Sequence, residues 1–397
     1  MRLTSIRIRN FKVFQNAKME NIPELCVLVG ANGTGKTTFF DVFGFIRDCL
    51  TFNVTRALQS RGGFREVVSR GHVDETILFE LQYRMLLTGK ERLVTYVLEI
   101  GYVNGRAVVE QEVLRYKRGS YGSPYQFLRF ERGSGFAVTN EEEFDKEDKQ
   151  LTREDQTLEA ADILAIKGLG QFQRFKAANA FRQLIENWHV SDFHITAARG
   201  SKDAAGYDEH LSVSGDNLQL VANYLYENHR DDIFPQIVAA MKSRVPGISS
   251  ISPISSPDGR LLLGFQDGSF ADPFLDRYVS DGTLKMFAYL VLLYDPKPHP
   301  LLCIEEPENQ LYSKLLIELA EEFRTYALRG GQVFVSTHSP DFLNACDLDE
   351  VYWLAKENGY SVIRRASDDE QICSYMQDGD KMGYLWKQGF FDGADPA

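Results

Sequence analysis

The chain has few cysteines and no long apolar run. Its five cysteines among 397 residues never stand in C-x-x-C spacing, so we expect neither a zinc ribbon nor a disulfide framework. The longest strongly apolar segment, residues 287–294, is far too short to cross a bilayer. The N-terminus lacks the apolar core of a secretory signal. These absences predict a soluble, cytoplasmic protein that has reduced thiols and no membrane partner.

An excess of positive charge is also lacking. The net charge of −12 argues against a surface built for non-specific binding to nucleic acid. Residues 140–160 alone hold nine acids against three bases, a local −6 that is half of the total. The remainder is therefore only mildly acidic, and a localised basic face stays open. We expect residues 140–156 to form a solvated, mobile linker.

What the sequence does contain is a phosphate-binding pattern. Residues 30–37 read G-A-N-G-T-G-K-T, a full match to G-x-x-x-x-G-K-[ST], between an apolar run at 25–29 and a helical segment that continues to 43. This strand-loop-helix context predicts a cradle for phosphates. Lys36 is expected to reach the β- and γ-phosphates, and the Thr37 hydroxyl to ligate Mg²⁺. The expected nucleotide-binding residues of this loop are Gly30, Asn32, Gly33, Thr34, Gly35, Lys36, Thr37 and Thr38.

A second motif, residues 301–309, reads L-L-C-I-E-E-P-E-N. Four apolar residues that end in carboxylates predict a buried parallel strand with charge at its carboxyl end, where ligands bind in α/β sheets. Glu305 is expected to hold Mg²⁺, and Glu306 to polarise the attacking water as general base. The alternative is a core strand that runs into an acidic turn, which is less favoured beside a phosphate loop.

Two further segments carry candidate residues. Residues 278–285 open an apolar helix, and Ser280, Asp281 and Gly282 at its start would make an anion site, unless Ser280 is only an N-cap. Residues 333–340 form an apolar strand that ends at His338, which could contact a γ-phosphate, although a lone histidine at a strand end is more often structural. Lys36, Glu306 and His338 are thus the candidate catalytic residues.

The remaining patterns outline the fold. Residues 6–9 alternate as a strand that ends at 10–12, and three alternating runs between residues 76 and 117, with an Asn104-Gly105 turn, predict an antiparallel layer. Helices are expected within 158–188 and at 217–226 and 233–241, the last capped by Asp231 or Asp232. Short strands near Ile251 and at 261–265 are expected to return the chain to the main sheet.

The four motifs stand in the order typical of ABC-type ATPases. The chain resembles the SMC/RecF-like group, in its AAA-like or OLD-like branch, over about residues 1–70 and 210–345. In this resemblance residues 280–283 take the signature position, 305–308 the Walker B position and 336–340 the switch-histidine position. It implies an α/β fold, that of a P-loop NTPase head with a mixed parallel core sheet, an antiparallel β layer and a mainly helical insertion. The implied sections are 1–135, 136–250 and 251–397.

The resemblance also implies cofactors and a mode of assembly. ATP and Mg²⁺ would bind between two heads of a homodimer or higher homo-oligomer, where Ser280 and Gly282 of one copy close on nucleotide held by residues 30–38 of the other. The chain departs from the family in three places. The signature lacks paired glycines, Glu305 replaces the commoner Asp, and residues 309–313 replace a usual His-Pro.

The function implied is an ATP-hydrolysing switch in DNA repair or anti-phage defence that regulates or assembles with an effector, a nuclease or a toxin. OLD-type nucleases carry a TOPRIM domain after the switch histidine. Only 59 residues (397 − 338) follow His338 here, so we expect any nuclease to be a separate polypeptide. The aromatic segment 384–391 is a candidate docking segment, and the alternative is a tail packed on its own core.

Other functions remain possible at this point. A DNA-binding clamp in repair would use residues 115–118 and a basic, aromatic helical surface, but solvated helix faces also explain these residues and are the favoured explanation. That surface comprises Lys167, Arg174, Lys176 and Arg182, with Phe172 and Phe175. The ATPase subunit of a transporter is disfavoured by the long insertion and by the Glu-Glu-Pro-Glu segment. A kinase or GTPase is less favoured still, because neither class needs the Ser280 signature or His338.

Overall fold

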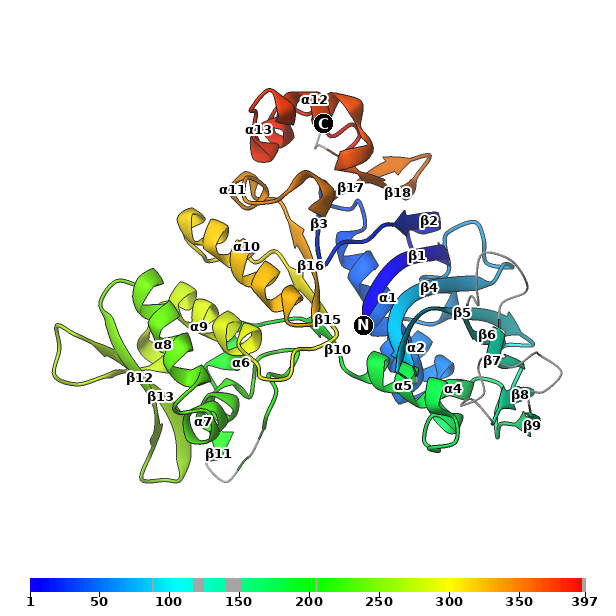
Figure 1. Ribbon diagram of the computed structural model, residues 1–397, viewed down its shortest axis with the longest axis horizontal. Coiled ribbons are helices and arrows are strands. Elements are labelled where there is room, and N and C mark those ends of the chain that lie inside the picture. The colour runs from blue at the N-terminus through cyan, green and yellow to red at the C-terminus, as the bar shows by residue number, and fades with distance from the viewer. Residues whose placement is uncertain are drawn as a thin grey trace. The chain divides into compact units, whose positions relative to one another are not determined.

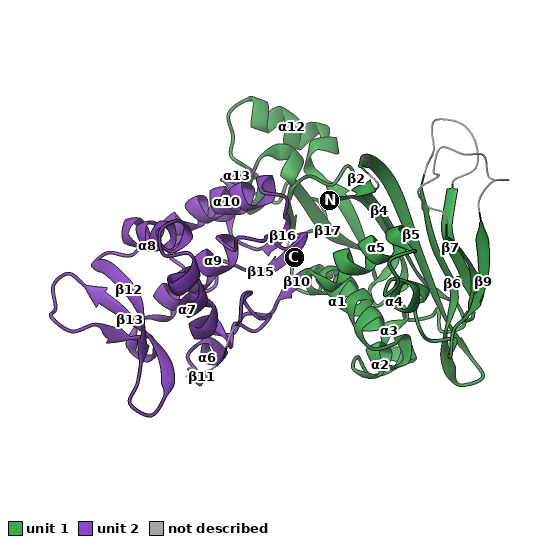
Figure 2. Cartoon of the chain, turned by 60° about the horizontal axis from the view of Figure 1, so that its bottom comes forward, with its two compact units in different colours: residues 1–188, 347–397 green, residues 189–346 purple. Residues whose placement is uncertain are grey.

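The computed structural model describes residues 1–87, 89–116, 125–139, 152–200, 202–203, 206 and 208–394. The chain divides into two compact units, coloured green and purple in Figure 2. Unit 1 comprises residues 1–188 and 347–397, and unit 2 comprises residues 189–346. The chain therefore leaves unit 1 once and returns to it. The three sections expected from the sequence stay a prediction of domain organisation, and most of the expected linker, residues 140–151, lies outside the described residues.

Unit 1 contains an eight-stranded sheet in the order β2-β1-β4-β5-β6-β7-β8-β9, antiparallel throughout. The predicted antiparallel layer is confirmed, and Asn104 and Gly105 have the positive φ angles (51° and 79°) of a tight hairpin. Residues 153–156 belong to a strand, so the expectation of a linker is wrong there. The strands are β1 (Arg2–Phe11), β2 (Phe14–Glu20), β4 (Ile77–Leu87), β5 (Lys90–Val103), β6 (Arg106–Tyr116), β7 (Tyr125–Glu131), β8 (Ser134–Val138) and β9 (Arg153–Thr157).

Helices cover one face of this sheet (Figure 1). The ring of Phe45 on α1 packs against those of Phe11 and Phe79, with centroids 5.4 and 5.7 Å away. Phe181 of α5 lies 4.7 Å from Tyr96. Within 158–188 the structure has two separate helices, α4 and α5, because residues 170–175 form turns. The helices of unit 1 are α1 (Lys36–Thr51), α2 (Val54–Gln59), α3 (Phe64–Val67), α4 (Ala165–Leu169), α5 (Lys176–Glu186), α12 (Glu370–Gln377) and α13 (Met382–Lys387).

Unit 1 also brings the two ends of the chain together. Strand β3 (Leu25–Val29) is buried throughout and pairs in parallel with β17 (Val351–Glu357), which pairs antiparallel with β18 (Tyr360–Arg365). Phe391 is fully buried against Trp353, and of the aromatic segment 384–391 only Tyr384 is a large exposed hydrophobic residue. The tail is therefore packed on its own core through Leu385, Trp386 and Phe391, and the docking interpretation is wrong for these buried side chains.

Unit 2 contains parallel strands β15 (Leu301–Glu305) and β16 (Gln332–Thr337), and β10 (Trp188–Ser191) lies beside β15. Strands β12 (Ile248–Ser255) and β13 (Arg260–Asp267) form a separate small sheet with β11 (Lys202–Asp203) and β14 (Phe274–Leu275). The expectation that they rejoin the main sheet is wrong. The helices are α6 (Ile195–Ala198), α7 (Leu218–Asn228), α8 (Ile233–Arg244), α9 (Asp281–Leu293), α10 (Ser313–Leu328) and α11 (Pro340–Leu343).

Two smaller expectations also need comment. Asp232 occupies the N-cap position of α8, as predicted, but its side chain makes no capping hydrogen bond. The helices α7 and α8 confirm the two helices expected at 217–226 and 233–241. Within the described ranges, no helix combines the length and the apolar character that a membrane crossing requires.

A buried carboxylate lies within the antiparallel sheet of unit 1. Glu112 of β6 is 1% exposed and accepts hydrogen bonds from the Tyr96 hydroxyl (3.1 Å), from the amide of Ile166 (3.1 Å) and from the amide of Ala165. Burial raises the pKa of Glu112 to about 7, although the three hydrogen bonds act in the opposite direction. This carboxylate connects the sheet to the start of α4, and no sequence pattern had indicated it.

The raised pKa predicts a pH dependence of stability. Because the folded chain binds the Glu112 proton more tightly than the unfolded chain does, the contribution is full below the ordinary pKa of 4.5 and is lost as the pH rises through about 7. From pH 5 to pH 8 the free energy of unfolding should fall by about 2–3 kcal/mol more in the wild type than in Glu112→Gln. Urea unfolding at both pH values measures this difference. An equal fall in the free energy of unfolding of the two proteins between pH 5 and pH 8 would refute the prediction.

Candidate functional site

The phosphate loop of unit 1 follows β3 and curls around a lysine. The Lys36 ammonium, on the first residue of α1, donates to the carbonyl oxygens of Gly30 (2.7 Å) and Ala31 (3.2 Å). Lys36 is buried, whereas Asn32, Gly33 and Thr37 are exposed. The loop thus holds a cation at its centre and presents its backbone at the start of a 16-residue helix, where the helix dipole favours an anion.

Two glycines of this loop are required for different reasons. Gly35 has a φ of +105°, and a Cβ there would lie 2.8 Å from Val13 Cγ2. Gly33 has a φ of +82°, but a Cβ there would meet nothing within 4 Å. Both positions disfavour an L side chain. Gly35 also has no room for a side chain, because Val13, in the turn that joins β1 to β2, lies directly against it.

The loop is held from behind by the C-terminal part of the chain. Ser361 of β18 donates its hydroxyl to Thr34 O (2.6 Å), and Ala31 N donates to Ala394 O (2.7 Å). Thr34 Oγ1 in turn donates to Ala31 O (2.8 Å). The contacts of Ser361 and Ala394 join residues more than 300 positions apart. Sequence reasoning missed them because single serine and alanine residues carry no pattern.

Helix α1 is anchored by an ion-pair network. Asp41 accepts from Lys12 Nζ (2.6 Å) and from Arg61 Nε (2.8 Å), and Arg61 also reaches Asp48 (2.8 Å). Lys12 comes from the strand motif at the N-terminus. Arg61 lies in the short loop between α2 and α3. The network orients the helix whose first turn carries Lys36, Thr37 and Thr38.

In unit 2, strand β15 ends in an unusual backbone conformation. Four residues of β15 are buried, and Glu305 is half-buried and in register with Ser336 of β16. Glu306 has a φ of +42°, rare for a residue other than glycine, and its amide donates to Ser336 O (2.9 Å). One Glu306 carboxylate oxygen accepts from Asn309 Nδ2 (2.9 Å), and the other lies 3.3 Å from His338 Nε2.

Glu308 fixes the histidine loop. Its Oε1 accepts from Thr337 Oγ1 (2.8 Å) and from the His338 amide (2.7 Å). The third carboxylate of the Glu-Glu-Pro-Glu run therefore orients the backbone that carries His338, while Glu306 faces the His338 ring. Sequence reasoning had given Glu308 no role. Its signal was its place in an acidic run at the end of a buried strand.

The start of helix α9 packs against the loop that follows β15. A Cβ on Gly282 would lie 2.6 Å from Gln310 O, and Lys285 Nζ donates to Asn309 O (2.8 Å). Burial lowers the pKa of Lys285 to about 8, although Glu308 and Glu306 act in the opposite direction. Ser280 is exposed and caps the helix by accepting from Thr283 N (3.2 Å). Ser280 therefore is an N-cap, and its contact with a phosphate stays a prediction.

Arg199 holds the segment that leads into α9. Its guanidinium donates to the carbonyls of Asp276 (2.7 Å) and Val279 (2.8 Å) and to Asp281 Oδ1 (2.5 Å). One side chain thus makes hydrogen bonds to three residues of the segment 276–281. Sequence reasoning missed Arg199, because it lies 80 residues before Val279 and in no motif.

The structure thus brings the predicted site residues together in two groups, one in each unit. Residues 30–38 form the loop of unit 1, while residues 280–282 and 305–306 and His338 surround the end of β15 in unit 2. The amides and Lys36 of the loop fit a phosphate group, and the Thr37 hydroxyl and Glu305 carboxylate are the hard oxygen ligands that Mg²⁺ prefers. The donor sets therefore fit a magnesium nucleotide.

The basic residues considered for DNA contact are engaged within unit 1. Lys167 donates to Thr51 O (2.9 Å), Arg174 lies 3.2 Å from Glu154, and Arg182 pairs with Glu186 at 2.6 Å. Phe175 is buried, whereas Phe172 is 57% exposed. Residues 117 and 118 lie outside the described residues. These contacts give the DNA-clamp reading no particular support.

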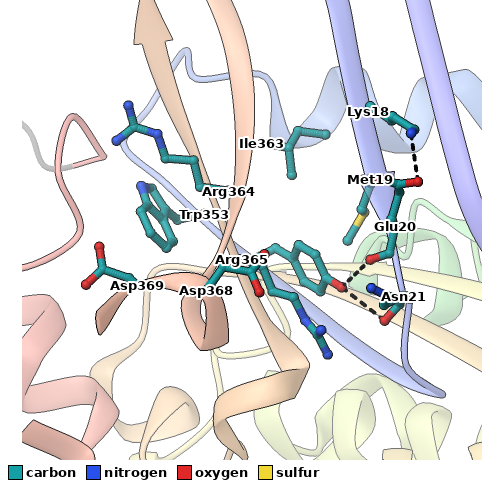
Figure 3. Close-up of a pocket in the computed structure, with 11 residues that line it drawn as sticks. Lys18, Met19, Glu20, Asn21, Trp353, Ile363, Arg364, Arg365, Asp368 and Asp369 are labelled. Carbon is teal, nitrogen blue, oxygen red and sulfur yellow. Dashed lines mark hydrogen bonds and ion pairs between the residues drawn. The ribbon is translucent and has the colours of Figure 1, made fainter. Parts of the chain in front are cut away.

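A cavity of about 510 Å³ in unit 1 is separate from the predicted site residues. It is lined by residues of β2, β17 and β18 and of the segment that follows β18. Figure 3 shows Lys18, Glu20 and Arg365 among its lining residues, and the Tyr352 hydroxyl donates to the carbonyls of Glu20 (3.0 Å) and Asn21 (3.2 Å). None of the predicted nucleotide-binding residues lines it.

Comparison with known families identifies the chain. A family model described as "AAA domain, putative AbiEii toxin, Type IV TA system" matches residues 126–344, more than half of the chain. The chain belongs to this AAA domain family. A second model, described as "AAA ATPase domain", matches residues 1–159. A comparison with curated proteins found no match.

Solved structures show the fold of this AAA domain protein. It is similar to an SMC head bound to the C-terminal winged-helix domain of ScpA, with a TM-score of 0.54, 13% identity, and 92% of this chain and 97% of that chain covered. It is also similar to a Pyrococcus furiosus Smc head with an extended coiled coil, bound to the C-terminal domain of ScpA (TM-score 0.50, 13% identity, 94% and 99% covered). The expected SMC/RecF-like ATPase resemblance and P-loop NTPase fold are confirmed.

The two glycines of the phosphate loop give a matched test. Gly35→Ala and Gly33→Ala both place an L residue at positive φ, at a cost of about 1–2 kcal/mol each. Gly35→Ala should lose a further 1–3 kcal/mol or so, because its Cβ meets Val13. Thermal unfolding measures the difference. Equal destabilisation by the two variants would contradict this account of the loop.

Arg199 gives a test in unit 2. Arg199→Ala removes three hydrogen bonds from a charged donor and should destabilise the protein by about 2–3 kcal/mol. Arg199→Lys should recover only part of this, because an ammonium cannot reproduce the guanidinium fork. The matched control is Arg260→Ala, an exposed arginine of the same unit that pairs with Asp258, which should change stability by less than about 0.5 kcal/mol. Chemical denaturation compares the three variants.

Proposed function

We propose that this AAA domain protein is an ATP-binding and ATP-hydrolysing switch. In the proposal it dimerises head-to-head around ATP, and the state of the nucleotide regulates a separate effector protein, a nuclease or a toxin. The setting is DNA repair or anti-phage defence. Support comes from the site of each unit, from the family and from the fold.

One observation carries the proposal for hydrolysis. The Glu306 carboxylate lies at the carboxyl end of a buried parallel strand and is held between the Asn309 amide and the His338 ring. A general base must be fixed within hydrogen-bond reach of the water that it activates. The left-handed backbone at Glu306 turns this side chain away from the path of the strand, and such strain is often found at functional sites.

Each remaining residue has a proposed role. ATP would supply the phosphoryl group, and Mg²⁺ held by Thr37 and Glu305 would neutralise its charge. Lys36 would exchange its present acceptors, Gly30 O and Ala31 O, for phosphate oxygens. Glu306 would accept a proton from the attacking water, and His338 would hold the γ-phosphate. Glu308, which binds the backbone of the histidine loop, is a positioning residue.

The proposed dimer rests on the start of helix α9. Ser280 and Asp281 are exposed there, and the 13-residue helix directs the positive end of its dipole towards them. Arg199 and the contact of Gly282 with Gln310 O hold this helix start in place. Such a surface suits the γ-phosphate of nucleotide bound to a second copy, which Ser280 and Gly282 would contact.

The descriptions of similar proteins support the proposal of a separate effector protein. The family description names a toxin of a type IV TA system, and both SMC heads were solved with a domain of a different protein, ScpA. A head of this fold can therefore carry a separate polypeptide. Purification of the protein from its native host, with mass spectrometry of what elutes with it, tests this part of the proposal. Recovery of the chain alone, with and without ATP, would contradict it.

Glu306→Gln is the central test of the function. The amide cannot accept the proton of water, so ATP turnover should fall about 10²–10³-fold, while ATP still binds. Light scattering after size exclusion should then show the ATP-bound dimer accumulate. Glu321→Gln, an exposed glutamate of α10 in the same unit, is the matched control and should behave as the wild type does.

Lys36→Ala separates binding from hydrolysis. It should bind ATP too weakly to form the dimer, because the phosphates lose their buried cation.

Turnover by Glu306→Gln at the wild-type rate would show that Glu306 is not the base. A Glu306→Gln protein that stays monomeric at saturating ATP would refute the head-to-head dimer.

A further inference from the structure

Two loops of unit 2 place two histidines and an aspartate side by side, away from the residues assigned to nucleotide. Asp295 follows the end of α9, His299 precedes β15, and His210 lies in the loop before α7. One ligand atom from each residue lies within 4.8 Å of those of the other two. We propose that His210, Asp295 and His299 bind one divalent transition-metal ion, for which Zn²⁺ is the probe.

The donor set defines the class of ion. Two imidazoles and one carboxylate suit Zn²⁺ and its first-row neighbours, whereas Mg²⁺ and Ca²⁺ favour oxygen ligands alone. With metal–ligand bonds of about 2.0–2.1 Å, the ligand atoms of a tetrahedral site lie about 3.3 Å apart. Here His210 Nδ1 and Asp295 Oδ2 are 2.6 Å apart, and the three ligand atoms, one from each residue, all lie within 4.8 Å of one another. Shifts of about an ångström would therefore bring the three ligand atoms to the spacing of a tetrahedral site.

Contacts from outside the triad hold each member in place. The Asn217 amide donates to His210 O (3.0 Å) and accepts from Ser212 N (2.8 Å), which fixes the loop of His210. The His299 amide donates to the Tyr326 hydroxyl (2.7 Å). These contacts fix the backbone that carries each imidazole, and a fixed backbone favours a preformed site.

The carboxylate of Asp295 is held in the same way. Lys297 N donates to its Oδ1 (2.8 Å), so Oδ2 faces His210, and Arg329 donates to the Asp295 carbonyl (3.2 Å). The Asp295 side chain is only 4% exposed. A buried carboxylate needs a compensating positive charge, and an ion bound by all three residues supplies one.

The surroundings are rich in imidazole. The His299 ring lies 5.5 Å from that of His210 and 4.8 Å from that of buried His189, measured between centroids. An ordinary histidine–aspartate pair elsewhere in this unit looks different. His194 and Asp192 are two residues apart, 3.3 Å apart and 63% and 79% exposed. A simple ion pair between His210 and Asp295 requires neither His299 nor the supporting contacts.

The site is independent of the proposed ATPase chemistry. Asp295 follows the C-terminal end of α9, whereas Ser280 caps its N-terminus, and 13 helical residues span about 20 Å. His299 likewise precedes β15, while Glu305 ends it. The ion would join the distal ends of α9 and β15 to the loop before α7. Its expected effect is on the stability of unit 2 rather than on turnover.

The test uses the full chain, stripped with a chelator and then titrated with Zn²⁺ in the presence of excess Mg²⁺ and without nucleotide. Elemental analysis after dialysis should find one zinc per chain, and zinc should raise the thermal unfolding temperature. His299→Gln and His210→Gln should each weaken zinc binding at least ~100-fold. His194→Gln, at the exposed pair, should bind zinc as the wild type does.

A second measurement does not depend on the variants being folded. Co²⁺ added to the stripped wild type should give the intense visible absorption of a low-coordinate site with nitrogen and oxygen ligands, and Zn²⁺ should remove it. Substoichiometric zinc after dialysis, or wild-type affinity in both folded variants, would overturn the proposal. So would the weak absorption of hexa-aqua Co²⁺. All of these measurements are made without ATP. Their results therefore do not depend on whether the proposed ATPase function is correct.

Discussion

The backbone at the end of β15 is the constraint on which the site of unit 2 depends. A buried strand can pair its amides and carbonyls with its neighbours, but charged side chains must leave it where burial ends. At Glu306 the chain turns in the left-handed region, a conformation that costs about 1–3 kcal/mol and is held by the bond of Glu306 N to Ser336 O. The turn places Glu306 against Asn309 and His338, and the other contacts of the loop follow from it.

A comparable constraint shapes the phosphate loop of unit 1. There glycines provide the positive φ angles, and the loop closes on Lys36 instead of on a carboxylate. The loop does not hold this shape by local contacts alone, because Ser361 and Ala394 bind it from behind. Ion pairs of Asp41 with Lys12 and Arg61 orient the helix that follows. Both sites therefore combine a short, recognisable motif with supports that come from distant parts of the chain.

The success of sequence reasoning varied with the kind of signal. Strand β3 has the predicted bounds, and the Asn104-Gly105 hairpin forms as expected, because apolar runs and positive-φ turns are encoded locally. The strands at 248–267 were found but assigned to the wrong sheet. Residues 153–157 form a strand although their composition suggested a linker, because β9 pairs with β8 and alternates at the edge of the sheet. Pairing partners depend on tertiary contacts, which composition does not encode.

The amino-acid sequence by itself determined the four motifs, their order and the residue types that suit a nucleotide and Mg²⁺, because each of these is a short pattern with local physical meaning. Only the tertiary structure decided which polar residues support them. Arg199, Glu112 and the cluster of His210, Asp295 and His299 lie outside the motifs, and Glu308 lies in one without an assigned role. Each gains its role from contacts with partners elsewhere in the chain. The physical reason is that burial and hydrogen bonding depend on the complete fold, whereas periodicity and turn chemistry depend only on neighbouring residues.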